Sequence, residues 1–205
     1  MSKEEIHELL RRNAAPDKRS VSTAEGLEVA RAATQAAQAN GITCAVAGGL
    51  GMHLYGFTRA TTNVDMIADR PLDWPLKEKL SFGGETYGVI VGGREIDLDW
   101  IIRADFFREF YEAALRDTLQ ADLGLSVIGP EWMVILKYIS GRGKDQIDLL
   151  WLLQQPGLVD RAKVRRMMAS VLGEKAAALP LRELERLFLQ ADLVAESDRS
   201  SSESK

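Results

Sequence analysis

The sequence predicts an α/β (α+β) fold, with a small mixed sheet in its first half and a helical region in its second half. Two short apolar runs, at 42–47 and 64–68, are typical of buried strands. The runs TYGVIV and EIDLDWII flank Gly92-Gly93 within 85–102, which is the pattern of a β-hairpin with a tight turn. From about residue 105 onward, apolar residues recur with helical spacing.

Local start and stop signals place the remaining elements. An amphipathic helix is predicted for 3–13, and a second helix starts after Ser22, which forms a capping box with Glu25. A short helix is predicted for 50–55, and the segment 71–75 is predicted to be irregular or briefly helical. Helices of the second half are predicted at 105–117, 130–140, 144–154, 160–172 and 181–192.

These elements divide the chain into four parts. Residues 1–21 are expected to form the first helix and a linker, 22–104 the sheet-containing core, and 105–194 the helical region. The remainder, 195–205, is polar and low in complexity, which predicts a disordered tail.

Composition limits the classes of function. A net charge of −4 gives no basic excess, so general DNA binding is not expected. No apolar stretch approaches the ~18 residues that span a bilayer, and the charged N-terminus is not a secretory signal. The single cysteine, Cys44, fits a reducing cytoplasm, and two histidines with one cysteine exclude a structural zinc site.

The pair Gly48-Gly49 follows the first predicted strand and precedes a short helix. Backbone N–H groups at such a helix start can hold a phosphate, and glycine lets a ligand approach the backbone closely. The same pair also makes an ordinary turn that needs no ligand, so taken alone it does not assign a function.

Polar residues two positions apart mark one face of each of two predicted strands. Asn63 and Asp65 share a face, and Asp97 and Asp99 share a face, because side chains alternate along a strand. If the strands are neighbours, the carboxylates converge and require a cation, and hard oxygen ligands favour Mg²⁺ or Mn²⁺. The alternative is an edge strand with solvated aspartates.

These motifs together resemble the minimal nucleotidyltransferase superfamily, which shares the catalytic core of polymerase β, over roughly 22–103. The branch they resemble contains the AbiEii-type toxins and uncharacterised bacterial relatives. The resemblance rests on Gly48-Gly49, on Arg59-Ala60-Thr61-Thr62-Asn63-Val64-Asp65 and on Asp97. A weaker similarity continues in KYISGRGKDQIDLLWLL, with Lys137, Arg142, Lys144, Asp145 and Asp148.

The resemblance implies Mg²⁺-dependent transfer of a nucleoside monophosphate from an NTP to an RNA, a protein or a small molecule. A toxin of this branch would be paired with an antitoxin. The implied catalytic residues are Asp65, Asp97 and Asn63, and the implied metal ligands are Asp65, Asp97 and Asp99. The implied phosphate-binding residues are Gly48, Gly49, Arg59, Thr61, Lys137 and Lys144. Lys144 can equally be a solvated charge at a helix start.

One residue departs from the family pattern. Asn63 stands where the first aspartate is expected, and asparagine keeps a carbonyl oxygen but loses the charge. Asp99 could restore a carboxylate, the protein could hold a single metal, or it could bind nucleotide without transferring it. Strand alternation treats Asp97 and Asp99 alike, and only the family spacing favours Asp97.

Overall fold

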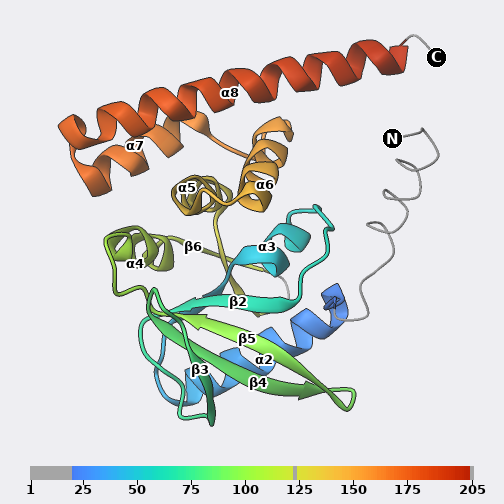
Figure 1. Ribbon diagram of the computed structural model, residues 1–205, viewed down its shortest axis with the longest axis vertical. Helices are drawn as coiled ribbons and strands as arrows, with labels where there is room; N and C mark the ends of the chain where they lie inside the picture. Colours follow the sequence, from blue (N-terminus) through green and yellow to red (C-terminus); the bar gives the residue numbers. More distant parts are fainter. Residues whose placement is uncertain (1–19, 122–123, 204–205) are drawn as a thin grey trace, which may run out of the picture.

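The computed structural model describes residues 20–121 and 124–203, which form seven helices around one seven-stranded mixed sheet (Figure 1). The strand order is β3-β4-β5-β2-β1-β7-β6. The strands are β1 Cys44–Val46, β2 Asn63–Ala68, β3 Leu76–Lys79, β4 Gly84–Val91, β5 Arg94–Ile101, β6 Thr118–Gln120 and β7 Ser126–Ile128. The helices are α2 Thr23–Ala39, α3 Gly48–Leu54, α4 Arg108–Arg116, α5 Pro130–Ser140, α6 Gly143–Gln154, α7 Arg161–Leu172 and α8 Glu174–Glu203. The predicted α/β class is confirmed.

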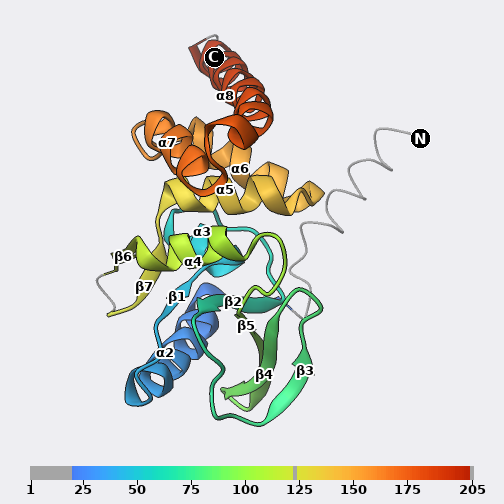
Figure 2. The same cartoon turned by 90° about the vertical axis from the view of Figure 1, so that its left-hand side faces the viewer.

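The sheet separates two layers of helix. Helix α2 covers one face, whereas α4, α5 and α6 lie on the other face, with α7 and α8 outermost (Figures 1 and 2). On the α2 side, Val29 and Ala33 pack in one core with Val64 and Leu98. On the opposite side, Ile67 packs in a second core with residues of α4, α5 and α6. Each face of the sheet is therefore buried under helices over part of its length.

Strands β2 and β5 lie side by side and run parallel, with Asn63 opposite Asp97 and Asp65 opposite Asp99. Val64, Met66, Leu98 and Trp100 are fully buried, and they belong to the core under α2. Side-chain alternation therefore turns the four polar residues toward the other face. The predicted proximity of the two polar strand faces is confirmed.

Two local predictions are confirmed in atomic detail. The Ser22 hydroxyl accepts a hydrogen bond from the Glu25 backbone N–H, and the Glu25 carboxylate accepts one from the Ser22 backbone N–H. Gly92 and Gly93 have φ of +57° and +80° and connect β4 to β5, as a primed turn requires.

The sheet is larger than the sequence indicates. Residues 76–79 form the edge strand β3, which pairs antiparallel with β4, and its four side chains are all exposed, so no apolar alternation marks it. Strands β6 and β7 lie in the region predicted to be helical, and they have only three residues each. Such short strands carry too little sequence pattern to be recognised.

Helix boundaries also differ at both ends of the helical region. Helix α4 begins at Arg108 rather than 105, and α8 begins at Glu174 and continues through Pro180. Buried residues on α8, among them Leu184 and Phe188, dock it on the core and sustain it past the proline. Helix α8 extends to Glu203, where the sequence predicted a disordered tail from 195, because propagation adds one hydrogen bond per residue to a helix that has already formed.

The helix predicted for 3–13 lies outside the described residues, as does nearly all of the segment 1–21. Among residues 20–121 and 124–203, none of the helices combines the length and the apolar character needed to cross a bilayer.

Two independent reasons require glycine at position 48, its backbone conformation and the closeness of Asp65. Its φ of +54° lies in the left-handed region, and a Cβ built on it would lie 1.9 Å from Oδ2 of Asp65. At Gly49 a Cβ would lie 2.6 Å from Oγ1 of Thr61. The glycine pair therefore lets α3 start directly against the strand that carries Asp65.

We expect Gly48→Ala to destabilise the protein more than Gly92→Ala does. Gly92 has a similar φ of +57° but nothing within 4 Å of its Cβ position, so its substitution isolates the conformational cost, about 1–2 kcal/mol. Contact with Asp65 should add about 1–3 kcal/mol at Gly48. Urea unfolding measures both free energies, and equal losses for the two variants would contradict the close approach of Gly48 to Asp65.

Candidate active site

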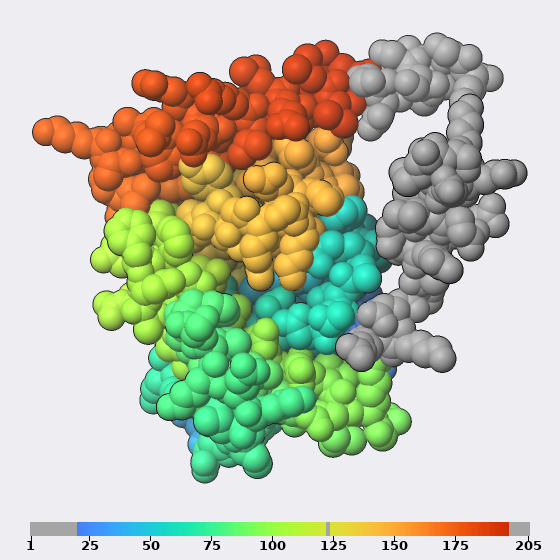
Figure 3. All heavy atoms as spheres, in the orientation of Figure 1, coloured from blue at the N-terminus to red at the C-terminus, as the bar shows by residue number. Residues whose placement is uncertain are grey.

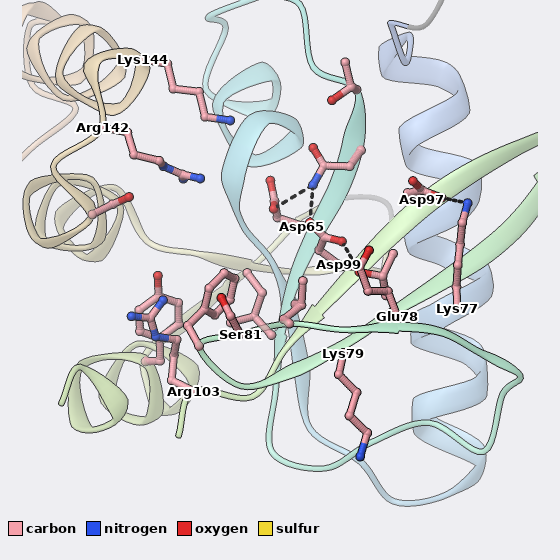
Figure 4. A pocket seen from close by; sticks show the side chains of 18 of the residues that line it. Asp65, Lys77, Glu78, Lys79, Ser81, Asp97, Asp99, Arg103, Arg142 and Lys144 are labelled. Carbon is pink, nitrogen blue, oxygen red and sulfur yellow. Dashed lines mark hydrogen bonds and ion pairs between the residues drawn. The ribbon is translucent and has the colours of Figure 1, made fainter. Parts of the chain in front are cut away.

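A cavity of about 1000 Å³ opens between the sheet and the helical half of the chain. Figure 3 shows the surface hollowed between the green part, β3 to β5, and the orange part, α5 and α6. Strands β2 and β5 form its floor, β3 forms one wall, and α4 with the start of α6 forms the other. Among the lining residues are Asn63, Asp65, Asp97, Asp99, Arg142 and Lys144 (Figure 4).

Asn63 joins two carboxylates on the floor of this cavity. Its amide Nδ2 donates hydrogen bonds to Oδ1 of Asp65 at 3.1 Å and to Oδ2 of Asp99 at 2.7 Å. The Thr86 hydroxyl donates to the other Asp99 oxygen at 2.8 Å. Two carboxylates from neighbouring parallel strands thus converge on one nitrogen atom.

The environment of Asp99 disfavours its charged form. Burial raises the pKa of the Asp99 carboxyl, and the negative charges of Asp65 and Asp97 raise it further, whereas the hydrogen bonds from Thr86 and Asn63 oppose these effects. A cation bound between Asp65 and Asp99 would relieve the repulsion.

Asp97 lies apart from this pair. Its Oδ1 accepts a hydrogen bond from Lys77 Nζ at 2.5 Å, and the same ammonium contacts Glu95 at 2.7 Å. In Figure 4, Asp97 is turned toward Lys77, away from Asp65 and Asp99. Within the part of the chain that the structure describes, no three His, Cys, Asp or Glu side chains group as a metal site. Of the three predicted metal ligands, Asp65 and Asp99 thus lie together, whereas Asp97 is paired with Lys77, and their role as metal ligands stays a prediction.

A chain of ion pairs on the helical side reaches the cavity at Arg142. Arg59 donates to both carboxylate oxygens of Asp148, at 2.6 and 2.8 Å, and Lys137 contacts Asp148 at 2.7 Å and Asp145 at 2.8 Å. Arg142 completes it with a contact of 2.5 Å to Asp145. These five residues are called the buried ion chain below. Both aspartates have no solvent exposure, so each depends on its cationic partners.

The buried ion chain also determines the charge state of Asp145. Burial alone would raise the pKa of Asp145, but hydrogen bonds from Arg142, Lys137 and Ser140 hold it at about 2. Asp145 is therefore ionised throughout the neutral range and keeps Arg142 attached to the start of α6.

Several residues expected to bind phosphate have other partners. Arg59 and Lys137 belong to the buried ion chain, where Asp145 and Asp148 match their charges, and their binding of phosphate stays a prediction. Thr61 is buried, and its hydroxyl donates to the backbone oxygen of Asn63 at 3.1 Å. That hydroxyl therefore serves the turn before β2, and its binding of phosphate stays a prediction.

The other three residues expected to bind phosphate, Lys144, Gly48 and Gly49, lie in different surroundings. Lys144 lines the large cavity, and its binding of phosphate stays a prediction. Gly48 borders a smaller pocket of about 50 Å³, which Asp65 and Arg142 also line. Gly49 packs against Thr61 and lines neither pocket, so the structure accounts for it by packing.

Two arginines of the cavity wall were not among the expected site residues. Arg142 points toward the cavity from the start of α6, and its side chain is 61% exposed although its Nε contacts Asp145 (Figure 4). The family-like motif contains Arg142 but assigns it no role. Arg103 follows β5 and lies among aromatic rings of the β3–β4 loop and α4. Three of its partners, Asp105, Phe107 and Tyr111, are close in sequence, whereas Phe82 comes from the preceding loop, and no motif marks the group.

We expect Asp148→Ala to cost about 3–5 kcal/mol of unfolding free energy, because it leaves Arg59 without its carboxylate partner and Lys137 with Asp145 alone. The exposed pair Arg108–Glu112, at 3.2 Å, supplies the control. Glu112→Ala should cost less than about 1 kcal/mol. Urea unfolding of both variants checks the difference, and a similar small cost for each would show that the buried ion chain does not hold the two halves together.

The fold of this chain resembles that of a solved structure. The chain is similar to the crystal structure of an antigenic nucleotidyltransferase-like protein from Paracoccidioides brasiliensis, with a TM-score of 0.50 and 17% identity over 80% of this chain and 94% of that one. The sequence matches no protein-family model and no curated protein. At this identity the likeness establishes the fold alone, and the AbiEii-type branch stays a prediction. The chain has a nucleotidyltransferase-like fold.

Proposed function

We propose that the protein transfers a nucleoside monophosphate from an NTP to an acceptor, assisted by one divalent cation, Mg²⁺ or Mn²⁺. The observation that carries the proposal is the convergence of Asp65 and Asp99 on Asn63, on the floor of a cavity whose wall presents Arg142 and Lys144. Paired carboxylates opposite paired cations suit a metal-bound triphosphate.

The residues on the cavity floor fit one hard cation. Asp65 and Asp99 both lie within hydrogen-bond distance of a single nitrogen, which shows that one small group can bridge them. Turning the Asn63 amide over would bring its carbonyl oxygen to the position that Nδ2 now takes, and Asn63 would then supply a third oxygen ligand. Oxygen ligands are those that Mg²⁺ and Mn²⁺ prefer. When bound, the cation would neutralise phosphate charge and lower the pKa of an attacking hydroxyl.

The side chains of the chain itself orient the triphosphate. Arg142 offers a planar guanidinium whose direction is set by Asp145, and Lys144 adds a second positive charge two residues further on at the same helix start.

The proposal also includes the class of molecule that accepts the nucleoside monophosphate. The sequence resemblance to AbiEii-type toxins supports an RNA or protein acceptor in the cytoplasm and a function that arrests growth unless an antitoxin is present. Induced expression in a bacterial host checks this part: wild type should stop growth, and Asp65→Ala should relieve the arrest. Equal arrest by both forms would contradict a toxin that acts by transfer.

A second candidate function has its own observation. Asn63 replaces the carboxylate that the family pattern places first, and its amide donates to both remaining carboxylates. A protein with that arrangement could bind nucleotide without transferring it. The two candidates make opposite predictions for Asn63→Asp, which would restore the missing charge.

For the leading proposal we expect Asp65→Ala and Asp99→Ala to reduce transfer by about a hundredfold or more, because each removes a ligand of the cation. Glu112→Ala is the control, since Glu112 is an exposed carboxylate on α4 that does not line the cavity. It should retain transfer within about threefold, a change smaller than a 1.4 kcal/mol difference. Incorporation of α-labelled NTPs with Mg²⁺ or Mn²⁺, using RNA and protein acceptors, measures these rates.

The same assay separates the two candidate functions. Transfer by the wild type that is lost in Asp65→Ala excludes the purely binding protein. No transfer by the wild type, together with transfer by Asn63→Asp, would overturn the enzymatic proposal and support the second candidate.

A further inference from the structure

The three aromatic side chains among the described residues that line the cavity gather around one guanidinium. The centre of the Arg103 guanidinium lies 4.6 Å from the Phe82 ring centroid, 4.9 Å from that of Tyr111 and 5.6 Å from that of Phe107. Phe82 comes from the β3–β4 loop, whereas Phe107 and Tyr111 come from the start of α4 and from α4 itself. Phe82, Phe107, Tyr111 and Arg103 are called the aromatic shelf below.

The aromatic shelf is ordered before any ligand arrives. Asp105 accepts hydrogen bonds from Arg103 at 2.9 and 2.5 Å, and the Arg103 side chain is only 13% exposed. The loop that carries Phe82 is held against β5, because a Cβ at Gly83 or Gly84 would lie within 2.3 Å of a backbone oxygen. A rigid platform of this kind loses little conformational entropy when a ligand binds to it.

The shelf occupies one end of a chemically divided cavity. In Figure 4, Asp65 and Asp99 lie between Arg103 at one end and the Lys77–Asp97 pair at the other. The Lys77 end is ionic, since Lys77 is paired with both Glu95 and Asp97. Tyr111 of the shelf borders a small pocket together with Asp65 and Arg142. A ligand with phosphates near Arg142 therefore has an aromatic surface on one side and an ionic surface on the other.

We propose that the aromatic shelf binds the base of the donor nucleoside triphosphate by stacking, and this inference rests on the proposed function of the cavity. A flat, uncharged base gains stacking energy on aromatic rings and gains little at an ion pair. Every base has a π-face, so recognition by stacking tolerates all four bases. The acceptor then lies toward Lys77 and Asp97.

Binding of the four NTPs is compared with binding of inorganic triphosphate, each with Mg²⁺, to the full-length protein. Inorganic triphosphate carries the phosphates without a base, so it reports the cation and Arg142 end alone. Phe82→Leu keeps apolar bulk beside Arg103 but removes the ring, and it should weaken all four NTPs about fivefold or more while leaving triphosphate affinity within about twofold. Phe82→Trp should keep NTP affinity.

Phe106→Ala is the matched control, because Phe106 neighbours the shelf, is 83% exposed and does not line the cavity. It should change neither affinity. Thermal melting of each variant detects loss of folding, and Phe82→Trp supplies a second test should Phe82→Leu unfold.

Each alternative outcome overturns the inference in a recognisable way. Equal losses for NTPs and triphosphate would make Phe82 a structural residue. Unchanged NTP affinity, with weakened binding of a single-stranded RNA oligonucleotide, would assign the shelf to the acceptor. If the wild type binds neither NTP nor triphosphate, the proposed function itself fails and the shelf proposal fails with it, whereas binding of both with no effect of Phe82→Leu removes the shelf proposal alone.

Discussion

The buried ion chain is the interaction on which the arrangement of the cavity depends. Asp145 and Asp148 are fully buried on α6, and an unpaired charge at either position would be strongly destabilising. Their partners come from the loop before β2, from α5 and from α6 itself, so the pairing connects the sheet to the helical half. Because Arg142 is bound to Asp145, the same contacts place a guanidinium at the cavity wall. The ion pairs that stabilise the contact between the sheet and the helices thus also position the Arg142 guanidinium.

A second constraint acts on the cavity floor. The parallel register of β2 and β5 places Asp65 opposite Asp99, and it turns both away from the apolar core under α2. Gly48 contributes by its lack of a side chain, since α3 begins where any Cβ would collide with Asp65. The glycine pair, which taken alone is compatible with a phosphate loop or a plain turn, is explained by close packing against the carboxylate strand.

Local patterns made much of the fold predictable, whereas contacts between distant segments did not. The capping box, the Gly92-Gly93 turn and the alternation in β2 and β5 each depend on neighbouring residues, and the structure contains them. Strand β3 has no apolar side and was missed, so the capture of Asp97 by Lys77 could not be foreseen. Arg59 and Asp148 are 89 positions apart, and nothing in the sequence indicates that the charge of Arg59 is already matched.

Asn63 gives the site one negative charge fewer than the family pattern implies. Three adjacent carboxylates would repel one another strongly without cations, whereas two carboxylates and an amide can hold together by hydrogen bonds. The amide of Asn63 donates to Asp65 and to Asp99, and so keeps the pair assembled without a metal. Two negative charges balance one divalent cation, where three favour two. Under the proposed function, asparagine at this position fits a preformed site for a single cation, whereas under the second candidate the same replacement accounts for binding of nucleotide without transfer.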